Sequence, residues 1–162
     1  MTYRSPSPLS EKDREQIAAS LNARLADGLD LHSQIKVAHW NVKGPQFAAL
    51  HPLFETFALG LAVHNDTIAE RAVTLGAQVK GTARYVARAS TLPEYPADAS
   101  RDLVHVRLLA ERFEQYVVGL RESRDLAAEL GDEDTVDLLT AAVREFEKHA
   151  WFLRATLAEE SR

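Results

Sequence analysis

The chain has 162 residues, of which 46% are hydrophobic and 27% charged, as expected for one globular domain with a sizeable core. It contains no cysteine, which excludes disulfides, thiolate chemistry and sulfur-ligated zinc or iron–sulfur sites, so any metal must be held by oxygen and imidazole. The formal net charge of −5 argues against a continuous basic surface for nucleic acid.

The sequence shows no obvious run of about 18 apolar residues, and its start, MTYRSPSPLS, lacks the basic end and apolar stretch of a signal peptide. We therefore expect a cytoplasmic protein with no membrane segment, association with the nucleoid being an alternative. Residues 1–9 are expected to form a short flexible tail and residues 10–162 one folded domain.

Two long helices are predicted in the first half of the chain. Ser10 and Asp13 make a capping-box-like start for the first, whose apolar face runs from Ile17 to His39. The segment NVKGP ends it. A second periodic segment runs from about Gln46 to Leu75, where Gly76 can end the helix in a left-handed conformation.

The second half predicts a crossover and two further helices. Residues 77–97 have weak periodicity and contain two prolines, so we expect a long connection with a short helix around Ala89 to Leu92. Asp98 or Ser100 then caps a helix that stops at Gly131, and a last helix begins within DEDTVDLL. Four helices with short, long and short connections predict an all-α four-helix bundle with one crossover, the ferritin-like arrangement among others.

The second helix has two distinct faces. On a helical wheel the core-facing stripe consists of Phe47, Leu50, Phe54, Phe57, Leu61, Ile68 and Leu75. Roughly opposite lie His51, Glu55, Asp66 and Glu70, with the apolar residues Leu59, Ala62, Val63, Ala69 and Val73 between them. A helix that is apolar on both sides is buried on both sides, so this outer face is predicted to pack on another chain.

The outer face predicts an antiparallel pairing of two copies of this helix. His51 and Asp66 are 15 residues apart, about 22 Å along an ideal helix, so no single ion bridges them. In an antiparallel two-fold pair, however, position 51 lies opposite position 70 and position 55 opposite 66. Two identical inter-subunit sites result. The axis would pass between Gly60 and Leu61, where the glycine would let the two backbones approach.

The chemical types of the candidate ligands limit the choice of metal ion. Glu-x-x-His, which marks a di-iron site inside one bundle, does not occur in the sequence. Mixed imidazole and carboxylate ligands without sulfur suit iron or manganese, with zinc also open.

The segments KVAHWNVKG, ALHPLFETF and HNDTIAERAVTLGA closely resemble the Dps family, ferritin-superfamily proteins called DNA-binding proteins from starved cells, and LPEYP, DTVDLLTAA and WFL extend the resemblance over nearly the whole chain. The resemblance implies a hollow dodecamer with ferroxidase centres at its two-fold interfaces. It implies His39, His51 and Glu55 as metal ligands and catalytic residues from one subunit, and Asp66 and Glu70 from the other.

The same resemblance implies oxidation of Fe(II), typically with hydrogen peroxide and otherwise with dioxygen, and storage of the ferric product as mineral inside the cage. Both reagents that form hydroxyl radicals are thereby removed, which protects the cell and its DNA. Two residues depart from the family pattern. Glu55 stands where members more often carry Asp, and Pro52 lies inside the predicted helix, where it is expected to kink the first turns.

Other candidate residues have simpler interpretations. His64 and His32 are expected to be buried and hydrogen-bonded, with a supporting role for His32 near the site as the lesser alternative. Trp40 is expected to pack, radical quenching being the alternative, and Trp151 and Phe152 to belong to the core. The pair Glu145 and His149 is assigned to the solvated surface.

Acidic residues open the last helix, where they also complement the helix dipole. The family implies acidic three-fold pores in this region, so Asp132 and Asp137 are candidate pore residues. Direct DNA binding is weakly supported, because residues 1–9 contain a single basic residue, Arg4. The sequence thus favours a ferroxidase and iron-storage cage over two alternatives: a nucleoid-associated DNA-condensing protein, and a helical oligomer with structural zinc.

Overall fold

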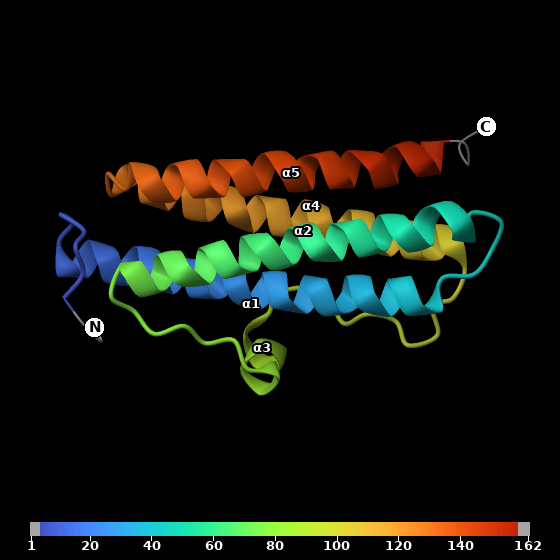
Figure 1. Ribbon diagram of the computed structural model, residues 1–162, viewed down its shortest axis with the longest axis horizontal. Helices are drawn as coiled ribbons and strands as arrows, with labels where there is room; N and C mark the ends of the chain where they lie inside the picture. Colours follow the sequence, from blue (N-terminus) through green and yellow to red (C-terminus); the bar gives the residue numbers. More distant parts are fainter. Residues whose placement is uncertain (1–3, 159–162) are drawn as a thin grey trace.

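The structure, a computed structural model, describes residues 4–158 (Figure 1). Its helices in this range are α1 (Glu11–Asn41), α2 (Phe47–Thr74), α3 (Ala83–Ala89), α4 (Asp102–Glu129) and α5 (Glu133–Leu157). Between residues 4 and 158 there is no strand, only an isolated bridge of Lys43 with Arg101. The four long helices lie side by side, with α3 on the outside of α1. The predicted all-α bundle with one long crossover and a short helix is confirmed.

Local sequence signals set most helix ends. The Ser10 hydroxyl accepts a hydrogen bond from the Asp13 amide at 3.1 Å, as predicted for the start of α1. Gly76 and Gly131 have φ values of 93° and 75°, so each ends its helix in the left-handed conformation that glycine adopts at little cost. Asp132 caps α5 by accepting from the Thr135 amide.

Two elements differ from the prediction. The short crossover helix covers Ala83–Ala89 and ends where we expected it to begin. The residue that caps α4 is Arg101, not Asp98 or Ser100, and its side chain makes no capping bond. The reason is tertiary. The amide of Asp102 donates to the Lys43 carbonyl at 2.9 Å, so the chain before α4 is held extended against the α1–α2 connection.

The interior is apolar and continuous through the four long helices. From α2, it receives Leu50, Phe54, Phe57, Leu61 and Ile68, each 2% exposed or less. Phe47, which the helical wheel placed in this stripe, is instead 47% exposed because it lies at the first turn of α2, beyond the core. Its ring contacts His51, with centroids 5.1 Å apart.

The outer face of α2 is uncovered in the single chain. Leu59 is 62% exposed and Val63 66%. By length and composition alone α2 is long and apolar enough to cross a bilayer, a test that core helices of soluble proteins also pass. Because α2 packs along α1 and carries ionisable residues on its outer face, we interpret that face as a protein contact.

The described part of the N-terminal segment makes hydrogen bonds to the folded chain. Residues 1–3 lie outside the described part of the chain. The Ser5 hydroxyl donates to the Thr74 carbonyl at 2.6 Å, and Arg14 hydrogen-bonds the Leu9 carbonyl, so residues 5–9 lie against the end of the bundle.

Candidate metal centre

His39 and His51 form a reciprocal pair that joins the end of α1 to the start of α2. The Nδ1 of His39 donates to the His51 carbonyl at 2.8 Å, and the Nδ1 of His51 donates to the His39 carbonyl at 2.9 Å. Their rings stack with centroids 3.8 Å apart. Because a carbonyl can only accept, both Nδ1 atoms carry a proton, so the ring atom left to bind a metal is Nε2 in each histidine.

Glu55 lies one turn along α2 beside this pair. One of its oxygens is 3.5 Å from the His39 Nε2 and forms a close ion pair with Lys36. That hydrogen bond with Lys36 lowers the pKa of Glu55, so the carboxylate is ionised and available to a cation. Sequence reasoning missed Lys36, although its position three residues before His39 places it on the same helical face.

Asp66 and Glu70 are exposed on the same outer face, further along α2. Asp66 borders an open groove between α1 and α2, with His32, Ala62, Asn65 and Ala69 among its lining residues. His32 is half-buried, and burial lowers its pKa. Within residues 4–158 of one chain, no group of three metal-ligating side chains is arranged to hold an ion. The candidate ligands lie in two separate groups in one chain: His39, His51 and Glu55, called the imidazole half-site, and Asp66 and Glu70, called the carboxylate half-site.

Gly60 has a neighbour that the two-fold prediction did not foresee. A Cβ at this position would lie 2.5 Å from Oε1 of Glu145, on α5 of the same chain. The missing side chain thus makes room for Glu145 within the bundle, and the expected close approach of two backbones at Gly60, which involves a second chain, stays a prediction.

The assignment of Glu145 and His149 to the surface is wrong for His149. This ring is 7% exposed and stacks on Phe57 with centroids 4.2 Å apart. Its burial lowers its pKa to about 4. Glu145 is hydrogen-bonded to His64 at 3.0 Å, which confirms that partly buried His64 has a partner.

The two tryptophans are exposed in the single chain. Trp40 is 67% exposed, with Lys36 over its ring, and Trp151 is 63% exposed. Neither belongs to the core, contrary to the prediction for Trp151, because both project from the outer sides of their helices; Phe152 is half-buried against the core.

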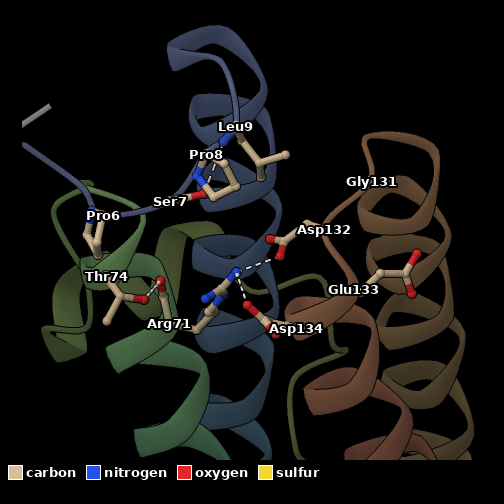
Figure 2. Close-up of a pocket in the computed structure, with 10 residues that line it drawn as sticks. All are labelled: Pro6, Ser7, Pro8, Leu9, Arg71, Thr74, Gly131, Asp132, Glu133 and Asp134. Carbon is tan, nitrogen blue, oxygen red and sulfur yellow. Dashed lines mark hydrogen bonds and ion pairs between the residues drawn. The ribbon is translucent and has the colours of Figure 1, made fainter.

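The acidic start of α5 faces a pocket at one end of the bundle (Figure 2). There Arg71 pairs with Asp132 at 2.5 Å and lies 3.8 Å from Asp134. Asp132 is 4% exposed, so it is committed to Arg71 and to capping α5, and this burial argues against a pore role for it. Asp137 is exposed.

The chain is similar in sequence to known proteins. A ferritin-like domain model matches residues 18–162. The chain is 39% identical over 160 residues to the DNA protection during starvation protein of Agrobacterium fabrum, covering 99% of both chains.

Solved structures of proteins with a similar fold are also related to this chain in sequence. Dps of Mycobacterium smegmatis has a TM-score of 0.91 at 31% identity, covering 96% of this chain and 94% of that one. The Vibrio cholerae Dps protein, described as a member of a broad superfamily of ferritin-like diiron-carboxylate proteins, has a TM-score of 0.89 at 28% identity, covering 97% and 99%.

Proposed function

Because this chain belongs to the Dps family of the ferritin superfamily, we propose that it is a ferroxidase and iron-storage protein whose iron sites form between two subunits. The observation that carries the proposal is the division of ligands along α2. Two imidazoles and a carboxylate gather at one end of the outer face, two further carboxylates lie toward the other end, and apolar residues separate the two groups. An antiparallel partner would bring unlike halves together.

The imidazole half-site is already oriented for Fe(II), the substrate. The reciprocal Nδ1 bonds of His39 and His51 fix both rings and leave Nε2 of each as a ligand atom. Glu55 adds an ionised oxygen. Asp66 and Glu70 of the partner would complete a mixed oxygen and nitrogen set, which suits iron, with manganese or zinc as competitors.

Two ferrous ions held together supply the two electrons that reduce one hydrogen peroxide, with two protons, to two waters. One electron from a single ion would instead release a hydroxyl radical. Carboxylates at the site favour the ferric product because they neutralise more of its charge. Hydrogen peroxide is the oxidant we propose, and dioxygen the slower alternative.

At the level of assembly, we infer a hollow dodecamer in the cytoplasm that holds ferric mineral. Exposed Asp137, near the start of α5, is the residue we retain as a pore candidate. Carboxylates around a pore would raise the local concentration of Fe(II).

DNA protection is the second candidate function, favoured by the names of the curated relatives. Direct contact with DNA has little support from composition, since Arg4 is the single basic residue among the first nine and the net charge is −5. A gel shift of the assembled protein that weakens as salt rises would support a DNA-binding role, and no shift at moderate salt would leave protection to iron removal alone.

Subunit mixing tests the shared site directly. His51→Ala and Asp66→Ala chains are each expected to lose peroxide-driven Fe(II) oxidation, followed by ferric absorbance. When the two are refolded together in equal amounts, half of the dimers are mixed and each has one intact site, so about a quarter of the activity returns.

A mixture of His51→Ala with Glu55→Ala is the matched control. Both changes fall in the same half-site, so every mixed dimer keeps one damaged ligand in each site and no activity returns. Equal recovery in both mixtures, or none in either, would contradict an inter-subunit site. Wild-type rates in the pure Asp66→Ala protein would refute the ferroxidase assignment.

A further inference from the structure

The bundle interior contains a polar contact that the proposed iron site does not use. The Oδ1 of Asn65 and the hydroxyl of Tyr116 both lie against Gly28, and neither atom has a hydrogen-bond partner among the described residues. Asn65 is 5% exposed and Tyr116 1%. Buried polar atoms are normally paired, so a contact that leaves two of them unpaired requires a reason beyond stability.

Gly28 is the residue that permits this contact. A Cβ at Gly28 would lie 2.1 Å from the Asn65 Oδ1 and 2.8 Å from the Tyr116 hydroxyl. A Cβ contact shorter than 3.0 Å forces the neighbouring atoms to move, so the contact of 2.1 Å with the Asn65 Oδ1 requires a displacement of at least 0.9 Å. The Tyr116 ring has little room to move, because it is buried and lies against Phe146, with ring centroids 5.5 Å apart.

Asn65 directly precedes Asp66, and the two residues border the same groove. Asn65 is buried against Gly28 of α1, while Asp66 is exposed on the outer face of α2. The distance between α1 and α2 at this level therefore sets where Asp66 stands, and Glu70 follows one turn later.

We propose that Gly28, Asn65 and Tyr116 are positioning residues. They hold α2 at the distance from α1, and at the rotation about its own axis, that the carboxylate half-site needs. This inference rests on the proposed function, because it assumes that Asp66 binds iron. A shift of 0.9 Å is large beside the roughly 0.2 Å tolerance of metal–ligand distances. Crowding at Gly28 would either push α2 outward or swing the Asn65 amide into the groove beside Asp66.

The test measures metal binding rather than turnover. Co(II), which is not oxidised under these conditions, is titrated by calorimetry into the assembled protein. Gly28→Ala is expected to weaken Co(II) binding about tenfold to a hundredfold, as other changes behind metal ligands do. Adding Asn65→Ala to Gly28→Ala makes room for the new methyl group and is expected to restore most of the affinity.

Gly119→Ala is the matched control. It is also a buried helix glycine, and a Cβ there would lie 1.8 Å from Nη1 of Arg24, but this contact joins α4 to α1 and leaves α2 alone. It is expected to alter stability without altering Co(II) affinity. Wild-type affinity in Gly28→Ala, or equal weakening in both glycine variants, would overturn the inference.

Two further variants allow the experiment to distinguish failure of the positioning role from failure of the proposed metal site. If Gly28→Ala does not fold, Asn65→Gln crowds the same contact from α2 and is expected to weaken Co(II) binding likewise. Asp66→Ala separates the two hypotheses: normal Co(II) binding in this variant would refute the proposed site itself, whereas its loss beside an unaffected Gly28→Ala and Asn65→Gln would refute only the positioning role.

Discussion

Replacing Leu59 with aspartate should separate the subunits and abolish iron binding without removing a ligand. Leu59 is 62% exposed in the single chain and lies near the centre of the outer face of α2. Fully burying a leucine side chain contributes about 1.5–3 kcal/mol, so covering the exposed part of Leu59 contributes about 1–2 kcal/mol per copy. Two-fold symmetry counts each residue twice, which gives about 2–4 kcal/mol per dimer.

The dimer dissociation constant should therefore rise at least about thirtyfold, before the added cost of desolvating two carboxylates. Sedimentation velocity measures the dimer, and Co(II) calorimetry measures the site. The fold of the single chain should survive, because Leu59 contacts little within it, and circular dichroism checks this.

Val118→Asp is the control for this experiment. Val118 is 53% exposed, but it lies on α4. Its replacement by aspartate should therefore leave the dimer formed through α2, and its Co(II) binding, intact. The reasoning fails if Leu59→Asp remains dimeric with normal Co(II) affinity, or if Val118→Asp disrupts the dimer equally.

Three further outcomes are expected. Burial lowers the pKa of His149 in the folded chain to about 4, below its ordinary 6.5, so the unfolded chain binds more protons between pH 4 and 6.5. The free energy of unfolding should therefore rise by up to about 3 kcal/mol from pH 4 to 6.5, and this gain should be lost when the pH falls again. Urea unfolding of wild type and His149→Phe checks this, and equal slopes against pH would refute it. Asp132→Ala should cost about 3 kcal/mol in thermal unfolding, since Arg71 and the α5 cap lose their partner, while Asp134→Ala at the surface should cost under about 1. Asp137→Asn should slow Fe(II) oxidation at low salt while Co(II) affinity stays unchanged, and an unchanged rate would argue against a pore role.

The helices and their ends could be predicted where the signal is local. Ser10 caps α1 by accepting a hydrogen bond from the amide of Asp13, and Gly76 ends α2 because glycine readily adopts a positive φ. Neither signal depends on residues far away in the sequence. The outer face of α2 was equally readable, because helical periodicity alone separates Leu59 from Leu61.

What the sequence could not reveal depends on contacts between elements. His149 resembles a solvated partner of Glu145 on its own helix, but its ring contacts with Phe57 of α2 and Phe113 of α4 make it a core residue. Likewise Arg101 is the cap of α4 because its neighbours Ser100 and Asp102 are hydrogen-bonded to the backbone of Lys43, far away in sequence. Glu145 of α5 occupies the space beside Gly60, a contact between two helices that the pattern of α2 alone does not indicate.

The mutual carbonyl bonds of His39 and His51 have a consequence for the order in which the molecule is built. Both residues belong to one hairpin of adjacent helices, so their geometry can be complete while α4 and α5 are still being synthesised. If the proposed site is right, a newly made subunit would then meet its partner with two imidazoles and the Glu55 carboxylate already in place, and docking would need only to add the two carboxylates of the partner.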